Sequence, residues 1–368
     1  MQSNKINVLM ISYGKGALYE NKAGVLDRHI EYASYFESLE ILYLTKKKLN
    51  ILNFGKLKIT PVYGFSYLIC LFKALFKNFK NYQIVTTQDP FVTGIIGLYY
   101  KKKFGIKLHV QNHSNFIDNY NWIKEFYFLN KALNFIAKKI VLTSADRLRV
   151  VNNFEKQIYI DKLNIPENII DIAPIPINTI FTKKISKSEI SEFNKKHQIN
   201  SNKLKIGWAG RFVRLKRLDY LFELVSTIKD ELEIQLILAG DFENSDFDLK
   251  YLENKYSIKP IFTGQLAANE LVKFYHSLDV FVLTSEYEGY GVVLKEALTT
   301  GCPVLVWNKS KGTSDIVSSS YLADYFSNAN DFKIKLIKTI KTKNSKINYN
   351  DEPSSQLIIN SIKKTIYI

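Results

Sequence analysis

The sequence predicts an α/β protein of two domains, each built on a doubly wound parallel sheet. Its 368 residues are 46% hydrophobic and 23% charged, a globular composition with enough chain for two cores. Short apolar runs of strand type alternate with stretches of helical periodicity in both halves, which is typical of parallel sheets. A polar stretch rich in lysine and serine, residues 178–203, separates the halves.

These features predict four segments. We expect an N-terminal domain at residues 1–177, an interdomain connection with a surface helix at 178–203, and a C-terminal domain at 204–325. Residues 326–368 are rich in lysine and asparagine and only partly periodic, so we expect a helical tail there.

The N-terminal half carries strand-like runs with helical periodicity between most of them. The strand-like runs are Ile6–Ser12, Glu40–Leu44, Gln83–Thr87, Lys107–Gln111, Leu148–Val151 and Ile169–Ala173. The helical segments are Val25–Ser38, Tyr67–Phe79, Thr93–Phe104, Trp122–Leu142 and Phe154–Leu163. Because ligands of such sheets bind at the carboxyl ends of the strands, three of the loops are candidate binding loops.

The candidate loops hold glycines, an aspartate and a histidine. They contain Gly14, Gly16 and Gly24 after the first strand, then Gln88-Asp89-Pro90, and then Asn112-His113-Ser114-Asn115. Each loop also has a structural interpretation. The glycines can serve turns, Asp89 can cap the helix that begins near Phe91, and a lone histidine is often structural.

The C-terminal half begins with a strand that ends at Gly210-Arg211. The strand-like runs are Leu204–Ala209, Ile234–Ala239, Pro260–Phe262, Val280–Leu283 and Val304–Trp307, with helices from Leu218 to Val225 and over Asn269–Ser277. Arg211 and Lys216 lie in the loop after the first of these strands, where two cations can neutralise a diphosphate. Arg214 can take the place of Arg211, and a basic loop can also be merely solvated.

The stretch Thr284–Trp307 is the most informative part of the chain. It predicts an acidic, glycine-rich turn, a helix over Val292–Leu298 that stops at Gly301, and a strand. The helix N-terminus suits a phosphate, and glycine at 289 and 291 lets a ligand approach the backbone. Glu288 and Glu296 are placed to accept hydrogen bonds from vicinal hydroxyls. The alternative is an ordinary crossover helix with two solvated glutamates.

This stretch resembles a known family. Glu288 and Glu296 enclose seven residues in EGYGVVLKE, which is similar to the E-x7-E motif of retaining glycosyltransferases of family 4, with the GT-B fold. Tyr290 stands where the family usually has phenylalanine. The segments GRFVRLKRLDYL, LILAGD, FTGQL, VQNHSNF and TTQDPFVTG also resemble the family, so the resemblance covers about residues 5–325 and is most specific between 206 and 307.

The resemblance implies two Rossmann-like domains facing each other across a cleft, with the donor mainly on the C-terminal one. It implies that Arg211 and Lys216 hold the donor diphosphate, that Glu296 holds the ribose, and that Glu288 and His113 hold the sugar. Further donor-binding positions are Gly24, Gly210, Gly289, Tyr290, Gly291 and Val292. Asp89 and Asn115 are candidates for the acceptor side. Family members often return a C-terminal helix to the N-terminal domain, and Asp331–Lys343 or Gln356–Thr365 fits that role.

The expected reaction moves a hexose or related sugar from a nucleotide diphosphate sugar to a saccharide or lipid-linked acceptor, as in bacterial surface polysaccharide assembly. No cofactor or metal is expected, because Arg211, Lys216 and a helix dipole can neutralise the diphosphate without a divalent ion. Inversion with Asp89 or His113 as base stays open. A related epimerase or phosphorylase stays open too, and a nucleic-acid-binding protein is a weaker alternative because no such motif is present.

Charge and cysteine content bear on location. Lys and Arg total 51 against 35 acidic residues, and this net charge of +16 suits phosphorylated substrates or an anionic membrane face. Cys70 and Cys302 form no disulfide framework, and the N-terminus runs directly into a strand, so we expect a cytoplasmic protein. The segment Phe65–Lys80 combines an apolar helical face with a lysine stripe, which predicts contact with the inner membrane surface. The alternative is a helix packed in the core.

Overall fold

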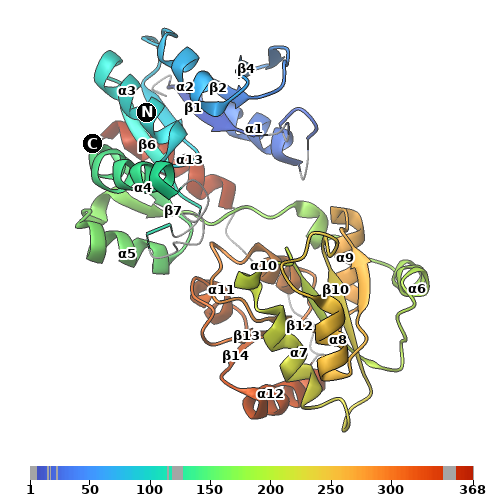
Figure 1. The fold of residues 1–368 in the computed structure, drawn as a ribbon. Helices are drawn as coiled ribbons and strands as arrows, with labels where there is room; N and C mark the ends of the chain where they lie inside the picture. The colour runs from blue at the N-terminus through green and yellow to red at the C-terminus, as the bar shows by residue number, and fades with distance from the viewer. Residues whose placement is uncertain are drawn as a thin grey trace. The chain divides into compact units, whose positions relative to one another are not determined.

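The computed structural model describes residues 6–14, 16, 18–21, 24–113, 116–117, 127–342 and 354–367. The chain forms two compact units (Figure 1). Unit 1 comprises Met1–Pro176 with Glu352–Ile368, and unit 2 comprises Ile177–Asp351. The C-terminal helix α13 (Ser354–Lys364) therefore belongs to unit 1, where it packs against β7, whereas α12 (Ala329–Thr342) packs on β14 in unit 2.

Unit 1 is built on a sheet with strand order β3-β4-β2-β1-β5-β6-β7-β8. The strands are β1 (Asn7–Tyr13), β2 (Ser38–Thr45), β3 (Leu52–Phe54), β4 (Leu57–Tyr63), β5 (Ile84–Thr87), β6 (Lys107–Gln111), β7 (Arg147–Val150) and β8 (Ile170–Ile172). All neighbouring pairs are parallel except β3 with β4. Because β1, β5 and β6 are neighbours, the three candidate loops that follow them lie at one edge of the sheet.

Helices cover both faces of this sheet. They are α1 (Val25–Ser34), α2 (Tyr67–Leu75), α3 (Val92–Phe104), α4 (Tyr127–Ile136), α5 (Asn153–Leu163) and α13. Along β1 the side chains alternate, so Val8 and Met10 pack in one core with α1 and α13, while Leu9 and Ile11 pack in the other with α2, α3 and α5. This two-layer covering is what a buried parallel sheet requires.

The structure corrects several predicted elements of unit 1. The helix predicted over Val25–Ser38 ends at Ser34. The Tyr35 amide donates to the Tyr32 and Ala33 carbonyls, which ends the helical pattern, and the chain then enters β2. The helix predicted over Tyr67–Phe79 ends at Leu75. The predicted helix Trp122–Leu142 is α4 followed by a π-helical turn and a 3₁₀ turn, and its first residues lie outside the described ranges.

Strands β3 and β4 were absent from the prediction. They form a hairpin around Gly55, which has a φ of 58°. Pro61 within β4 argues against a strand in the sequence, since proline donates no ladder hydrogen bond. The structure accommodates it next to the edge of the sheet, where β4 pairs with β2.

Unit 2 is built on a parallel sheet with strand order β11-β10-β9-β12-β13-β14. The strands are β9 (Leu204–Ala209), β10 (Ile234–Ala239), β11 (Ile261–Gly264), β12 (Val280–Leu283), β13 (Val304–Trp307) and β14 (Ala323–Phe326). The helices are α6 (Lys187–Lys196), α7 (Leu218–Ser226), α8 (Leu249–Tyr256), α9 (Ala268–Ser277), α10 (Val292–Thr299), α11 (Ser314–Ser318) and α12. Of these, α8, α11 and β14 were not predicted.

The two sheets confirm the predicted α/β class with two doubly wound layers. Within the described part of the chain, no helix is both long enough and apolar enough to span a bilayer.

Candidate functional site

The candidate donor site of unit 2 lies where the order of the sheet reverses. From β9 the chain continues to β10 on one side, and from β12 it continues to β13 on the other, which is the arrangement that places ligands in α/β sheets. The loops after β9 and β12 are joined here. The Thr284 hydroxyl donates to the Lys216 carbonyl at 3.0 Å, and the Glu286 amide donates to the Leu215 carbonyl at 3.0 Å.

Lys216 and Glu288 form a mostly buried ion pair in this junction. The Lys216 Nζ lies 2.6 and 2.8 Å from the two carboxylate oxygens of Glu288, and the Ser285 hydroxyl donates to the same carboxylate at 2.6 Å. The two side chains are only 15% and 9% exposed. The structure thus brings together two predicted site residues that are 72 positions apart, and each fixes the position of the other.

The start of α10 is open to an anion. Gly291 precedes the helix in the left-handed conformation, with φ 82° and ψ 43°, and no side chain caps the helix. A Cβ on Gly291 would lie 3.3 Å from Leu294 Cδ1 and 3.5 Å from Ile316 Cδ1. Because the first N–H groups of a helix have no partner within it, this terminus can receive a phosphate, as the sequence predicts.

Glu296 lies one turn inside α10 and is largely buried. The Tyr275 hydroxyl donates to its Oε2 at 3.0 Å. Burial raises the pKa of the Glu296 carboxyl to about 7, although the hydrogen bond from Tyr275 favours the ionised form. Near neutral pH this carboxyl is therefore poised between its two forms, and hydroxyl donors would stabilise the carboxylate.

The arginines of the β9 loop differ in their surroundings. Arg211 and Arg214 are both exposed, so either can reach a bound anion. Arg217 is already engaged, since its guanidinium pairs with Asp219 and Glu286 at 3.1 Å.

The backbone of the β9 loop at Gly210 packs closely against Gly240, a contact that the sequence did not reveal. A Cβ on Gly240, whose φ is 143°, would lie 2.0 Å from the Gly210 carbonyl oxygen. The end of β10 can therefore approach the β9 loop only without a side chain. The LAGD sequence at the end of β10 is the signal that could have indicated this.

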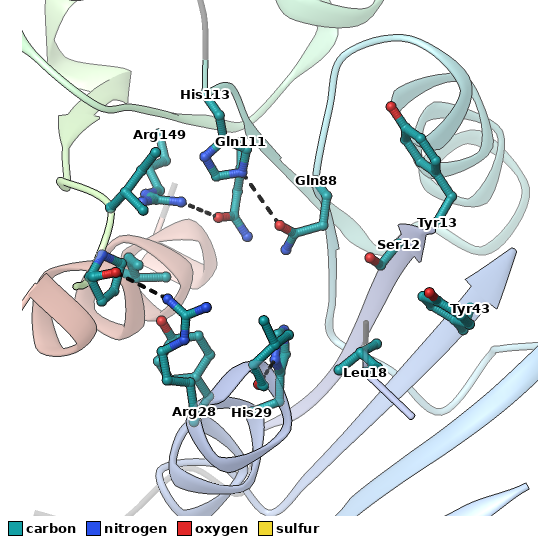
Figure 2. A pocket seen from close by; sticks show the side chains of 15 residues that line it. Ser12, Tyr13, Leu18, Arg28, His29, Tyr43, Gln88, Gln111, His113 and Arg149 are labelled. Carbon is teal, nitrogen blue, oxygen red and sulfur yellow. Dashed lines mark hydrogen bonds between the residues drawn. The ribbon is translucent and has the colours of Figure 1, made fainter. Parts of the chain in front are cut away.

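Unit 1 contains a separate pocket at the carboxyl ends of its strands, with a volume of about 270 Å³ (Figure 2). It brings together the ends of β1, β5, β6 and β7 with helix α1. Its lining residues are Ser12, Tyr13, Leu18, Val25, Arg28, His29, Tyr32, Tyr43, Gln88, Gln111, His113, Arg149, Ile175, Pro176 and Ile358.

His113 is the predicted site residue that lines this pocket. Its Nε2 lies 3.4 Å from the Gln88 Oε1, a long hydrogen bond. Burial, with a smaller contribution from the Arg149 charge, lowers the pKa of His113 to about 3. The imidazole is therefore neutral at physiological pH and can exchange hydrogen bonds with hydroxyl groups rather than act as a cation.

The other predicted residues of unit 1 are placed differently. The Asp89 carboxylate accepts from the Phe91 amide and the Thr93 hydroxyl, both at 2.7 Å, so it holds the turn into α3 and does not line the pocket. Gly24 precedes α1 with a φ of 68°. Asn115 lies outside the described residues. The acceptor-side roles of Asp89 and Asn115 stay predictions.

Sequence reasoning missed Arg28, Gln111 and Arg149. A charged residue inside the apolar run of β7 was the available signal for Arg149, which is only 2% exposed. The described residues contain no group of three or more His, Cys, Asp or Glu side chains that could hold a metal ion, and metal independence stays a prediction.

Comparison with known proteins supports a glycosyltransferase. The family described as glycosyl transferases group 1 matches residues 189–353, which include the whole donor-site junction. The chain is also 26% identical over 247 residues to the poly(ribitol-phosphate) alpha-N-acetylglucosaminyltransferase of Staphylococcus aureus, covering 65% of this chain and 44% of that protein. The chain spans about half the length of the curated relatives it matches.

Solved structures show the fold. Sucrose-phosphate synthase from Thermosynechococcus elongatus matches with a TM-score of 0.71 at 15% identity, covering 98% of this chain and 95% of the other. An Anabaena protein solved in complex with UDP and glucose matches with a TM-score of 0.69 at 14% identity, covering 98% and 94%. The fold class is GT-B, as predicted.

Proposed function

We propose that this chain is a retaining glycosyltransferase of family 4, which transfers a hexose or related sugar from a nucleotide diphosphate sugar to an acceptor hydroxyl. The observation that carries the proposal is the junction in unit 2. A lysine–glutamate pair, an uncapped helix N-terminus and a second buried glutamate are gathered where the strand order reverses. Each fits one part of such a donor: sugar, diphosphate and ribose.

The leaving diphosphate is the group whose charge develops during transfer. As the bond between the sugar C1 and the phosphate oxygen breaks, its electron pair stays on the diphosphate, where Arg211, Lys216 and the α10 N-terminus stabilise it. The acceptor oxygen forms its bond to C1 on the same face, and its proton passes to the departing phosphate oxygen. Glu288 and His113 orient the sugar, and Glu296 binds the ribose.

The acceptor is a saccharide or a lipid-linked molecule in bacterial surface polysaccharide assembly. The name of the Staphylococcus aureus relative, which describes a transferase acting on poly(ribitol phosphate), supports an acceptor of the cell surface. A neutral His113 is compatible with a carbohydrate neighbour, because it presents both a donor and an acceptor nitrogen.

The decisive measurement is release of free nucleotide diphosphate. The donor is first identified by screening UDP- and GDP-sugars for a rise in melting temperature, since a bound ligand stabilises the folded state. Transfer predicts nucleotide diphosphate only when acceptor is present, and activity that survives EDTA. Isomerisation of the donor without acceptor, or consumption of inorganic phosphate, would instead establish an epimerase or a phosphorylase.

We also propose that α2, together with Phe65 just before its N-cap residue Ser66, contacts the anionic inner face of the cytoplasmic membrane. Phe65, Leu68, Phe72 and Phe76 are 79%, 60%, 61% and 72% exposed and follow one another at helical spacing. The helix meets the core through Cys70 and Ala74 instead. An apolar face of this kind on the surface indicates an interaction site.

The core interpretation holds for part of this segment. Phe79 is buried, and Ile69 and Leu75 are half-buried, so the apolar face is narrower than the sequence pattern predicts. Lys73 and Lys80 are exposed beside it and Lys77 is half-buried, which suits anionic lipid headgroups.

Vesicle sedimentation tests this contact. Wild-type protein should sediment with vesicles containing phosphatidylglycerol at low salt. Glutamate at positions 73, 77 and 80 together should abolish sedimentation while the melting temperature changes little. Wild-type protein that stays in the supernatant would refute membrane contact without bearing on sugar transfer.

A further inference from the structure

A pair of tyrosine rings connects the pocket of unit 1 to helix α2. Tyr13 ends β1 and lines the pocket, and its side chain is 47% exposed. Its ring makes a T-shaped contact with the ring of Tyr67, the first residue of α2, at a centroid distance of 5.4 Å. Figure 2 shows Tyr13 on the side of the pocket away from Arg28 and Arg149. The N-terminal end of α2 therefore lies beside the pocket.

The exposed apolar face of α2 begins at the same place. Phe65 stands two residues before Tyr67 and Leu68 directly after it, and their side chains are 79% and 60% exposed. Phe72 and Phe76 continue the face along the helix and contact each other at a centroid distance of 4.9 Å. An apolar surface thus starts next to the ring that contacts the pocket lining.

Three exposed lysines lie over tyrosine rings in this region. The Lys46 Nζ lies 5.0 Å from the centroid of the Tyr67 ring. The Nζ atoms of Lys48 and Lys73 lie 5.8 and 5.6 Å from the centroid of the Tyr63 ring, and Lys73 also donates to the Tyr63 carbonyl at 2.9 Å. Aromatic rings attract ammonium groups but do not neutralise their charge. The rings therefore gather positive charge from the end of β2 and from α2.

These lysines keep their charge available to a ligand. In the part of the chain that the structure describes, Lys46, Lys48 and Lys73 form no ion pair, whereas the neighbouring Lys47 lies 3.8 Å from a carboxylate oxygen of Glu20. Three exposed ammonium groups with one carboxylate nearby produce a positive potential, and lysine binds phosphate groups as a point charge. The surface beside the pocket therefore suits a phosphate or a diphosphate.

We propose that Lys46, Lys48 and Lys73 bind the phosphate or diphosphate of a lipid-linked acceptor, with its sugar in the pocket of unit 1 and its lipid chain along the exposed apolar face of α2. Pocket, lysines and apolar face meet around Tyr67, as sugar, phosphate and lipid meet in such a molecule. A soluble neutral saccharide would use the pocket but neither the lysines nor the apolar face. The acceptor role rests on the proposed transfer reaction, whereas binding of a lipid phosphate can be measured without it.

Geranyl diphosphate is the probe, because it joins a short prenyl chain to a diphosphate and requires no knowledge of the sugar. Geraniol supplies the prenyl chain alone, and inorganic pyrophosphate supplies the diphosphate alone. Each is titrated calorimetrically into the whole chain without membrane, with saturating UDP present to occupy unit 2. Geranyl diphosphate should bind at least about tenfold more tightly than either part, since one molecule engages both surfaces.

Two matched double variants locate the binding. Lys46→Gln with Lys48→Gln removes two lysines of the proposed site. Lys102→Gln with Lys103→Gln removes two exposed lysines elsewhere in unit 1, and Lys103 also lies over an aromatic ring, 5.1 Å from the centroid of Tyr99. The first pair should weaken geranyl diphosphate binding by about tenfold or more, since contacts to a charged group are lost, and should leave UDP binding unchanged. The second pair should change neither.

The charge of the two lysines is tested by a conservative variant. Lys46→Arg with Lys48→Arg keeps both cations and should retain most of the affinity that the glutamine pair loses. Circular dichroism of each variant confirms that it is folded, and all of these positions are exposed.

Three outcomes would overturn the phosphate site. The first is geranyl diphosphate that binds no more tightly than pyrophosphate or geraniol. The second is an equal loss of affinity in the Lys102 and Lys103 variant, which would indicate attraction by net charge alone. The third is unchanged geranyl diphosphate binding in the Lys46 and Lys48 variant together with lost sedimentation on phosphatidylglycerol vesicles, which would assign these lysines to ordinary lipid headgroups. Failure of the transferase would be separate, since no nucleotide diphosphate would be released although geranyl diphosphate binds.

Discussion

The two units hold cationic side chains by different kinds of contact. Each holds cations at the carboxyl ends of its strands. In unit 2, Lys216 is neutralised at 2.6 Å by Glu288. In unit 1, Arg28 and Arg149 line a pocket and donate to the carbonyl groups of Pro176 and Ala173. The comparison teaches that a carboxylate from a neighbouring loop fixes the cation in unit 2, whereas backbone carbonyl groups orient two arginines of the pocket lining in unit 1.

A second comparison concerns buried glutamates. Burial raises the pKa of Glu155 in unit 1 to about 8 and that of Glu296 in unit 2 to about 7. Glu155 accepts from the Asn112 side chain at 2.8 Å and fixes the loop that carries His113. Glu296 accepts from Tyr275 and lies beside the open end of α10. Glu155 therefore stabilises a loop, whereas Glu296 lies where it can contact a ligand.

The largest expected effect on stability comes from breaking the ion pair of unit 2. Lys216→Met should lower the free energy of unfolding by about 3 kcal/mol, because it leaves the buried Glu288 carboxylate without its cation. Arg28→Gln in unit 1 should cost less, about 1 kcal/mol, since it removes one hydrogen bond from a half-buried guanidinium to a backbone carbonyl. Urea denaturation followed by tryptophan fluorescence measures both, and Trp208 and Trp307 report on unit 2.

The double variant Lys216→Met with Glu288→Gln is the control, and it should recover part of the lost stability because no unpaired charge remains. A loss of stability as small for Lys216→Met as for Arg28→Gln would show that the two arrangements do not differ energetically.

The next effect concerns pH. Below pH 4.5 the Glu296 carboxyl is protonated in both states, and between pH 4.5 and about 7 only the unfolded chain loses the proton. The free energy of unfolding should therefore fall as pH rises through this window, by about 3 kcal/mol more than in Glu296→Gln. Denaturation at a series of pH values measures it.

Glu155→Gln is the matched variant in unit 1, and its difference from wild type should extend to about pH 8. Saturating UDP should lower the pKa of Glu296 and shrink only the difference seen with Glu296→Gln. Parallel pH curves for wild type and Glu296→Gln would contradict the raised pKa.

How far the sequence predicts the site also differs between the units. Glu288, Gly291 and Glu296 belong to one continuous stretch, so spacing alone places them on one turn and one helix. The pairing of Glu288 with Lys216 was not predictable, because 72 residues separate the partners and only the order of the strands brings them together.

In unit 1 the pocket is assembled from distant positions. Arg28, Gln111 and Arg149 come from α1, β6 and β7, and no local pattern joins them. Asp89 shows the opposite case, since its carboxylate accepts from the Phe91 amide in the turn before α3, near the predicted capping position, although no side chain caps α3 itself. The strands were predictable where they are apolar runs, and β3, β4 and β14 were missed. At β3 and β4 a short hairpin and Pro61 weaken the signal.

A smaller effect concerns turnover. Glu288→Gln and Glu296→Ala should each reduce transfer by at least about tenfold, which corresponds to about 1.4 kcal/mol of transition-state stabilisation, while the protein remains folded. Glu155→Gln in unit 1 should change turnover less, because Glu155 supports a loop and does not line the pocket. Initial rates of nucleotide diphosphate release measure all three, and a folded double variant of Glu288 and Glu296 with the wild-type rate would remove both carboxylates from the mechanism.

The smallest expected effect comes from replacing the glycines at the two ends of α10, Gly291 and Gly301, by alanine. Gly291 and Gly301 have nearly equal φ values of 82° and 81°. Alanine in this left-handed conformation should therefore destabilise the folded state by about the same amount, about 1 kcal/mol, at either position. No atom of the described residues lies within 4 Å of a Cβ at Gly301, whereas a Cβ at Gly291 would be 3.3 Å from Leu294. Gly291→Ala should therefore lower the melting temperature slightly more than Gly301→Ala and should alone weaken UDP binding, measured by titration. Equal UDP affinities in the two variants would mean that the diphosphate does not approach this end of the helix, and the charge of unit 2 would then rest on Arg211 and Lys216 alone.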